Sequence, residues 1–307
     1  MNTRSDPSVL DALCEDIRQH YRGSPNAADD LPTALPWLSL IRRRAPTAVG
    51  RGMLEPSVCF LAQGEKQLLV GERALRYSAG SYVQVGTAVP VSGQIIRASE
   101  AEPYYGMRIT LESKEVAEFI LDMQISLASD RARAAVVSVE QADKPLLEAL
   151  LRLLRLLERP ADVLVLGRLL KQEIMYHLII APGGGTLTRG IMGGERERAV
   201  SEAISWIRTH YDVPLRIAEL AETVHLSPSV LHRRFKAATM MSPLQYQKQV
   251  RLLEARNLLM REGAEAGNVA FQVGYESPSQ FSREYRRMFG ATPLQDAQQL
   301  RNAVLAL

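Results

Sequence analysis

The sequence predicts an α+β protein of two domains: a small β-barrel with a helical hairpin, and then an all-α domain with two helix-turn-helix units. Three observations support this prediction. The chain of 307 residues is long enough for two ordinary domains. Short strand-like segments occupy much of the first half. A set of helix signals occurs twice in the last third, which indicates a duplicated unit.

Residues 56–110 form short apolar runs between turn residues, a pattern typical of a small barrel or sandwich. The breaks fall at Gly64, Gly71-Glu72, Ala79-Gly80 and Pro90. We expect strands at 57–62, 67–70, 74–77, 82–85, 94–98 and 104–110.

Helices are expected at 112–124, 145–158 and 163–180, and the last two flank Arg159-Pro160 like the arms of a hairpin. A glycine-rich stretch with little periodicity follows, which predicts a connection between domains. The expected domains are therefore 1–181 and 195–307, with a linker at 182–194.

The repeat is clearest at Ser227-Pro228-Ser229, which returns fifty positions later as Ser277-Pro278-Ser279. Pro243-Leu244-Gln245 returns at the same offset as Pro293-Leu294-Gln295. Before the serines the offset becomes 49, because Glu276 is an extra residue. Each copy reads as helix, tight turn and helix.

In each copy the serine is expected to cap the second helix and the proline to be its first residue. Helical spacing then divides the side chains between two faces. The inward residues are Val230, Leu231 and Phe235 in the first copy, and Phe281, Tyr285 and Phe289 in the second. The outward residues are Ser229, His232, Arg233 and Lys236, then Ser279, Gln280, Arg283 and Arg287.

These outward side chains suit reading of the DNA major groove, which admits one helix. Arginine bonds guanine bidentately and glutamine bonds adenine in the same way. A solvated helix face explains any single arginine, but the same cap and the same arginine in two copies favour base reading. A connecting helix over 243–260, about 27 Å long, would hold the two reading helices about one DNA turn (~34 Å) apart.

The run Ala270-Phe271-Gln272-Val273-Gly274-Tyr275-Glu276-Ser277, with Phe289-Gly290-Ala291-Thr292-Pro293, resembles the signature of AraC/XylS-type bacterial transcription regulators. The resemblance spans residues 195–298. It implies a seven-helix domain with one recognition helix in each of two successive major grooves. One departure is His225, where the family often has glycine; histidine tolerates the left-handed backbone better than most residues.

The resemblance also implies roles for individual residues and partners for the protein. The family's base-contacting positions fall on Ser229, His232, Arg233, Ser279, Gln280 and Arg283. Phosphate contacts are expected at Ser227, Lys236, Ser277 and Arg287. The implied partners are a double-stranded DNA operator and RNA polymerase. The implied role is transcription regulation, and the sequence leaves open whether the protein is an activator or a repressor.

Residues 56–66, 77–80, 90–94 and 102–104 resemble the N-terminal domain of one AraC-type subgroup. That domain looks like a cupin-type barrel with a helical dimerisation element, and the match covers about residues 30–180. It implies ligand sensing or dimerisation: a homodimer formed through the N-terminal helices, or control by a small-molecule effector whose existence and identity the sequence does not fix.

Three other functions were weighed. A cupin-type metal enzyme with a DNA-binding appendage needs a histidine pair, and residues 21–176 contain no histidine. A DNA-repair methyl acceptor needs a cysteine cluster, and only Cys14 and Cys59 are present. An architectural DNA binder needs no base-reading side chains, whereas Gln280 and Arg283 favour base reading. We therefore expect no catalytic site, no metal and no cofactor.

Composition agrees with a DNA-binding protein of the cytoplasm. The start is acidic, unlike a secretory signal, and charged residues interrupt the apolar stretches at 146–157 and 163–180, so no membrane span is expected. Residues 195–307 hold 15 Lys/Arg and 12 Asp/Glu, against 22 of each in residues 1–194, so the positive excess lies in the C-terminal part.

Two features of the N-terminal half keep two interpretations each. Cys59, in an expected strand, is either a small buried hydrophobe or a reactive sensor of electrophiles or oxidants. The aromatic residues Trp37, Tyr77, Tyr82 and Tyr104 either pack the core or line a ligand pocket.

Overall fold

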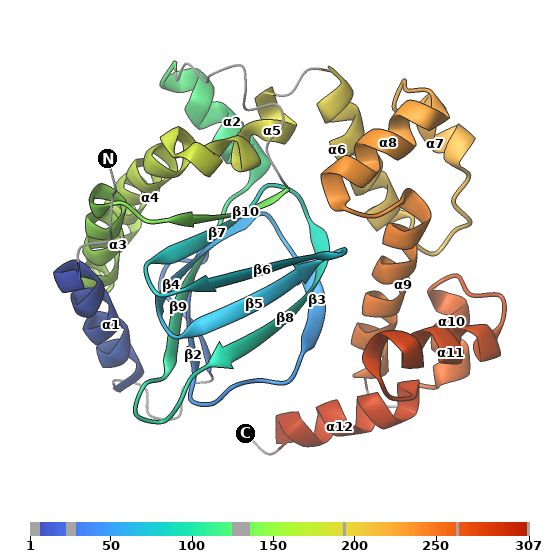
Figure 1. Ribbon diagram of the computed structural model, residues 1–307, viewed down its shortest axis with the longest axis horizontal. Coiled ribbons are helices and arrows are strands. Elements are labelled where there is room, and N and C mark those ends of the chain that lie inside the picture. Colours follow the sequence, from blue (N-terminus) through green and yellow to red (C-terminus); the bar gives the residue numbers. More distant parts are fainter. Residues whose placement is uncertain (1–6, 23–28, 125–135, 193–194, 262–263, 306–307) are drawn as a thin grey trace. The chain divides into compact units, whose positions relative to one another are not determined.

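The structure, a computed structural model, describes residues 7–22, 29–124, 136–192, 195–261 and 264–305 (Figure 1). The chain divides into two compact units, and the boundary in its second half lies between Glu197 and Arg198. The first unit is built on β-sheets and the second is helical, which confirms the predicted fold class of two domains.

The first unit contains two antiparallel sheets, with strand orders β1-β2-β9-β4-β7-β10 and β3-β8-β5-β6. Among the described residues neither order closes on itself, so the expected barrel is an open two-sheet sandwich. The strands are β1 (Asp30–Pro32), β2 (Leu38–Arg43), β3 (Gly50–Leu54), β4 (Ser57–Gln63), β5 (Glu65–Val70), β6 (Arg73–Ser78), β7 (Ser81–Val85), β8 (Val89–Arg97), β9 (Tyr104–Thr110) and β10 (Val137–Gln141).

Burial along the strands follows their place in the sandwich. Residues 57–62 of β4 are all buried, because helices cover one face of the six-stranded sheet and the second sheet covers the other. β5 and β6 alternate, since their outer face meets solvent. The predicted breaks at Gly71 and Gly80 are turns with φ of 59° and 80°, a backbone that glycine adopts at little cost.

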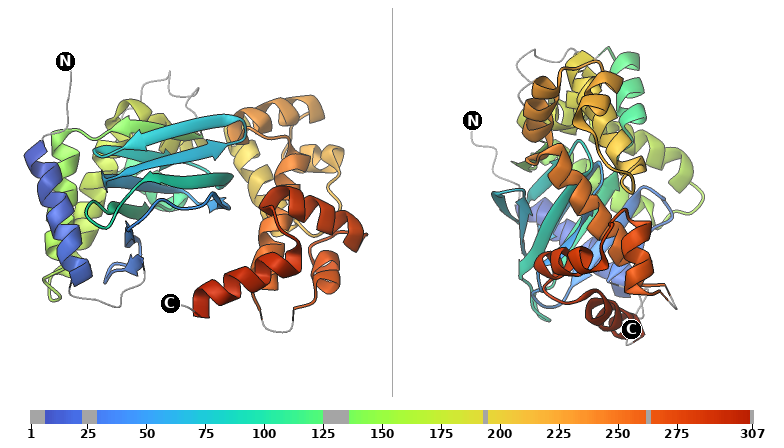
Figure 2. Two further views of the ribbon diagram at one scale, coloured as in Figure 1. Left: turned by 60° about the horizontal axis from the view of Figure 1, so that its bottom comes forward. Right: turned by 90° about the vertical axis from the view of Figure 1, so that its right-hand side faces the viewer.

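Four helices share the core behind the six-stranded sheet: α1 (Pro7–Arg22), α2 (Ser113–Asp122), α3 (Lys144–Leu156) and α4 (Val163–Ile180). α3 and α4 pack together, which confirms the predicted hairpin, and α1 lies along α3 (Figure 2). Asp143 caps α3 by accepting from the Leu146 amide at 3.1 Å. Our strand and helix predictions did not include α1, whose fully buried Leu13 and Ile17 belong to this core.

The segment expected to be a linker has a different structure. Residues 182–192 form a 3-10 turn, η2 (Pro182–Gly184), and α5 (Gly185–Met192), which packs on α2 and β7. The glycines here allow close packing: a Cβ on Gly183 would lie 2.4 Å from an oxygen of Glu140, and one on Gly184 2.0 Å from the Ile179 carbonyl. This segment is thus part of the first unit; residues 193–194 lie outside the described ranges.

The second unit contains α6 (Glu195–Thr209), α7 (Ile217–Thr223), α8 (Pro228–Thr239), α9 (Pro243–Leu259), α10 (Ala266–Gln272), α11 (Pro278–Phe289) and α12 (Pro293–Leu305). Their order agrees with two helix-turn-helix units, α7–α8 and α10–α11, joined by α9. In the described part of the chain, no helix is both long enough and apolar enough to cross a membrane.

Gly86 tests the docking of the η2–α5 segment. A Cβ at Gly86 would lie 1.9 Å from the Thr186 carbonyl oxygen, so Gly86→Ala must push this segment off β7. We expect a loss of about 1–3 kcal/mol in unfolding free energy, as for other overpacked sites, measured by urea denaturation. Gly52→Ala is the control, because a Cβ there meets nothing within 4 Å. Equal stability of the two variants would contradict the close docking.

Candidate nucleic-acid interface

The two helix-turn-helix units share one backbone geometry. In the first, the Leu226 amide donates to the Ala221 carbonyl at 2.8 Å. In the second, the Tyr275 amide donates to Ala270 at 2.9 Å, the equivalent pair at an offset of 49. The sequence repeat is therefore also a repeat of hydrogen bonds.

Both turns need a left-handed residue, and so do both C-termini of the second helices. The turn residues are His225 (φ 53°) and Gly274 (φ 84°), and the C-caps are Met240 (φ 61°) and Gly290 (φ 83°). Only glycine fits at Gly274, because a Cβ there would lie 2.0 Å from the Asp212 carbonyl oxygen. The left-handed His225 agrees with the sequence analysis, which did not find the Met240 cap.

The two helix starts differ in how their caps work. Ser277 is an N-cap whose side chain accepts from the Gln280 amide at 3.4 Å. Ser227 occupies the same position but makes no such bond; its hydroxyl lies 3.3 Å from that of Ser229. The predicted capping is thus correct for Ser277 and wrong for Ser227 as far as its side chain is concerned.

The predicted inward faces are largely correct. Leu231, Phe235, Phe281 and Tyr285 are fully buried, whereas Val230 and Phe289 are only partly buried. These side chains hold α8 and α11 against the rest of the unit. Phe235 packs edge-on against Tyr246 of α9, with ring centroids 5.4 Å apart.

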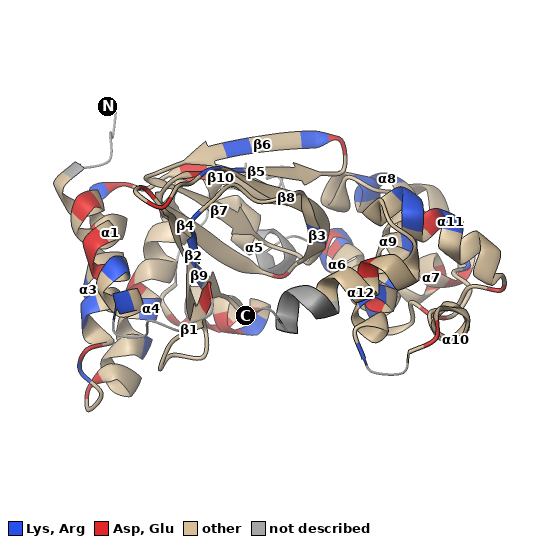
Figure 3. Ribbon diagram, turned by 90° about the horizontal axis from the view of Figure 1, so that it is seen from below, with Lys and Arg blue, Asp and Glu red and all other residues tan. Residues whose placement is uncertain are grey.

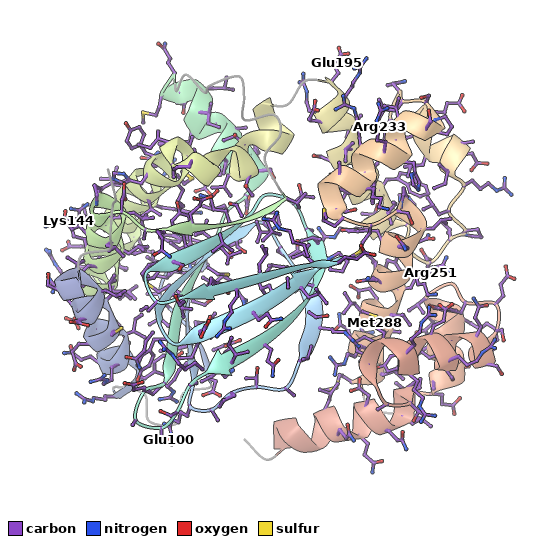
Figure 4. All side chains as sticks on the ribbon, viewed as in Figure 1. Glu100, Lys144, Glu195, Arg233, Arg251 and Met288 are labelled. Atoms are coloured by element: carbon purple, nitrogen blue, oxygen red, sulfur yellow. The ribbon has the colours of Figure 1, made fainter. Side chains whose placement is uncertain are left out.

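The expected DNA-contacting side chains lie on the solvent side of α8 and α11. The six candidate base readers, Ser229, His232, Arg233, Ser279, Gln280 and Arg283, are all exposed, and so are Ser227, Lys236 and Arg287; Ser277 is half-buried. Each helix thus presents its own set. Basic side chains follow α8 (Figure 3), and Arg233 extends from it (Figure 4).

Glu284 on α11 is an acidic residue that our sequence analysis did not consider. Its carboxylate accepts from Lys248 of α9 at 2.6 Å and from the Tyr275 hydroxyl at 2.8 Å, and it also bonds the Gln280 side chain. Burial alone would raise the pKa of Glu284, but these hydrogen bonds outweigh it and hold the pKa below its ordinary value. The network gives the exposed Gln280 side chain a hydrogen-bond partner within the protein.

Arg251 of α9 joins the loop that leads into α7 to the turn between α10 and α11. Its guanidinium donates to the carbonyls of Tyr211 at 2.5 Å and Val213 at 2.9 Å, before α7, and to that of Gly274 at 2.7 Å, in the second turn. One planar side chain therefore bonds the loop before α7 and the turn of the second helix-turn-helix unit. Sequence reasoning gave α9 only the role of a spacer, because carbonyl partners leave no pattern in a sequence.

A second arginine of α9 holds the last helix. Arg256 donates twice to Asp296 of α12, at 2.7 and 2.9 Å, and the buried carboxylate also accepts from the Tyr285 hydroxyl at 2.7 Å. This bidentate pair ties α9, α11 and α12 together.

The candidate residues of the N-terminal half are mostly buried. Cys14 and Cys59 are free thiols and both are buried. Tyr77, Tyr82 and Tyr104 are at least 96% buried, and Lys171 lies over the ring of Trp37. Within the described ranges, no three His, Cys, Asp or Glu side chains gather closely enough to hold a metal ion.

Comparison with known proteins agrees with this geometry. Residues 34–186 match the family model of the AraC-type transcriptional regulator N-terminus, and residues 220–299 match that of a helix-turn-helix domain. The chain belongs to the AraC/XylS-type transcription regulators.

Relatives of this regulator include the HTH-type transcriptional activator RhaS of Salmonella schwarzengrund, 25% identical over 166 residues, or 54% of the chain. The regulator spans 59% of the length of that curated relative. ToxT from Vibrio cholerae strain SCE256 shares the fold. The match to an apo ToxT structure has a TM-score of 0.57 at 10% identity, and it covers 85% of the present chain and 97% of the ToxT chain. The match to the unsaturated fatty acid bound form has a TM-score of 0.55 at 10% identity, and it covers 85% of the present chain and 93% of the ToxT chain.

Arg251 is the residue whose loss should affect the second unit most. In Arg251→Met, the carbonyls of Tyr211, Val213 and Gly274 lose their shared donor, and we expect a loss of about 2–4 kcal/mol in unfolding free energy. Urea denaturation measures it. Arg216→Met is the control, since its guanidinium is exposed and pairs only with Glu219. If both variants unfold at the same urea concentration, the hydrogen bonds of Arg251 do not stabilise the helical second unit.

Proposed function

We propose that this regulator binds a double-stranded DNA operator and reads it with α8 and α11, each in one of two successive major grooves. The observation that carries the proposal is the paired exposure of Arg233 and Arg283 on two helices of matching geometry. Both arginines lie fifty positions apart in the repeat, so one arrangement of side chain and backbone is presented twice.

The base-contacting roles follow from the side chains. Arg233 and Arg283 suit guanine, whose O6 and N7 accept two bonds from one guanidinium, and Gln280 suits adenine. His232 donates or accepts according to its tautomer. Ser229 and Ser279 are short enough for the backbone of their helices to approach the bases closely.

Gln280 must change partners to act on a base. Its side chain bonds Glu284 in the free protein. Since Glu284 keeps Lys248 and Tyr275 as donors, it stays satisfied when Gln280 turns to DNA. The network therefore does not require the bond to Gln280, whose side chain is free to exchange Glu284 for a base.

We assign the phosphate contacts to Lys236 and Arg287, and to the helix starts at Ser227 and Ser277. Because the Ser277 hydroxyl already caps α11, its contribution would come from backbone amides at the helix start, which attract anions. The Ser227 hydroxyl makes no capping bond and could donate directly to a phosphate oxygen.

We further propose that the first unit mediates a homodimer and receives an effector. α4 carries exposed apolar side chains at Leu166, Leu169, Tyr176 and Ile180. The steps between them are three, seven and four residues, which place all four on one side of the helix as a seam. A curated relative is named a transcriptional activator, which supports activation through contact with RNA polymerase. Such a role places the protein in the bacterial cytoplasm with the chromosome.

Loss of either arginine should reduce sequence preference. Arg233→Ala and Arg283→Ala should each weaken operator binding by about 1–3 kcal/mol, while binding to scrambled DNA changes much less. Fluorescence anisotropy measures both, on an operator located by footprinting the protein on its own upstream region. Lys236→Ala should instead weaken binding to every duplex and lower the salt slope by about one. Wild-type preference in both arginine variants would disprove the assigned reading faces.

If the seam on α4 is the dimer interface, a charged residue introduced there should give a monomer. Leu169→Glu would bury a carboxylate without a partner in the interface, so we expect the dimer dissociation constant to rise by at least about tenfold in sedimentation equilibrium. Leu121→Glu on α2 is the control, because Leu121 is also exposed but lies off the seam. Unchanged assembly in Leu169→Glu would exclude α4 as the interface.

A further inference from the structure

Five polar side chains meet between the two sheets of the first unit: Cys59, Lys66, Tyr77, Tyr104 and Arg108. Cys59 and Arg108 are opposite each other on β4 and β9, and their side chains are hydrogen-bonded. Lys66 and Tyr77 are opposite on β5 and β6. Tyr77 bonds Tyr104 across the space between the sheets. We call these five residues the interior cluster.

Lys66 breaks the apolar pattern of its strand. Leu68 and Val70, two and four residues later, are both 3% exposed and face inward, and alternation places Lys66 on the same side. Arg108 lies between Met107 and Ile109, which belong to the core behind the sheet, so its own side chain faces the opposite way, toward the second sheet. Charged residues at inward positions are costly, and where they persist they often mark a functional site.

Among the described residues, no ion pair joins a carboxylate to Lys66 or Arg108. The charge of Asp30 acts on both cations from a distance, but its carboxylate pairs with Arg43 at 2.8 Å. The Arg108 Nε is buried and makes no hydrogen bond. Burial lowers the pKa of Lys66, since the ammonium has lost water without gaining an acceptor.

The hydrogen-bonding groups of the interior cluster limit the class of ligand that could satisfy them. Lysine and arginine only donate hydrogen bonds, and the tyrosine hydroxyls can donate as well, so the missing component is an anion rich in acceptors. The neighbouring inward side chains Leu61, Leu68 and Ile95 are buried and aliphatic. Such surroundings favour a monoanion with an apolar body over a dianion, whose desolvation costs more.

We propose that the interior cluster binds a small organic carboxylate, with Lys66 and Arg108 as its counter-ions and the Tyr77 and Tyr104 hydroxyls as further donors. This inference rests on the proposed function in one respect: it identifies the carboxylate as the effector of the regulator. Carboxylate binding itself requires no DNA, so carboxylate binding and DNA reading can be disproved independently.

The test uses the full chain without DNA. Acetate, butyrate and hexanoate are titrated while thermal unfolding is followed, with acetamide, butyramide and hexanamide as uncharged counterparts. At least one carboxylate should raise Tm, because a ligand bound only to the folded state stabilises it, and its amide should not. Amide shift changes in NMR should concentrate on β5, β6 and β9.

Variants separate binding from packing. Lys66→Met and Arg108→Met should weaken carboxylate binding by at least about tenfold. Lys66→Met should also raise Tm without ligand, because it removes a half-buried ammonium that pairs with no carboxylate; a lysine with a merely structural role would lower Tm when replaced. Lys114→Met and Arg73→Met are the controls, since both residues are exposed.

Four results would overturn the proposal: no carboxylate raises Tm, the amides act as well as the acids, sulfate or phosphate binds more tightly than every carboxylate, or Lys66→Met binds like wild type. Operator binding by the same preparations is measured in parallel. If operator preference is intact while the carboxylate arm fails, the inference alone falls. If carboxylate binds and Arg233→Ala keeps wild-type preference, the proposed DNA-reading role falls instead.

Discussion

The proposed reading of DNA by two helices requires a fixed separation between them, and one contact within the protein bears on it: the Arg251 guanidinium bonded to the carbonyls of Tyr211, Val213 and Gly274. A single short helix with one arginine has little selectivity. Two such helices read a longer site only if their separation is constant. α9 supplies the length, and Arg251 fastens the backbone before α7 and the backbone of the second turn to the same point of α9. Since no donor other than arginine spans three carbonyls in one plane, the constraint lies in a single residue.

Much of the second unit could be predicted because its determinants are local. Ser277 and Pro278 begin α11, Gly274 and Gly290 take positive φ, and helical spacing separates Phe281 from Arg283. Each of these depends on a few neighbouring residues. The bonds from Arg251 to carbonyls, and from Glu284 to Lys248, depend on distant segments and on backbone atoms that every residue possesses. No residue pattern identifies them.

The first unit was less predictable for a different reason. Strands and breaks were readable from turn residues, yet whether sheets close depends on pairing between strands far apart in sequence, as in β4 with β9. Glycine also has two opposite uses. In residues 183–184 it indicated a linker, whereas the structure uses the missing side chains to bring backbone within contact of Glu140 and Ile179. Composition alone cannot tell whether a glycine serves backbone flexibility or close packing.

The duplicated units carry unequal conformational strain. The second copy places glycine at both left-handed positions, whereas the first places His225 and Met240 there, at a cost of roughly 1–2 kcal/mol for such a residue. We therefore expect the first helix-turn-helix unit to be the less stable of the two. On heating, its turn and C-cap should open before those of the second, so that amide exchange is faster in α7–α8 than in α10–α11. Two copies of one motif would then unfold locally in a fixed order.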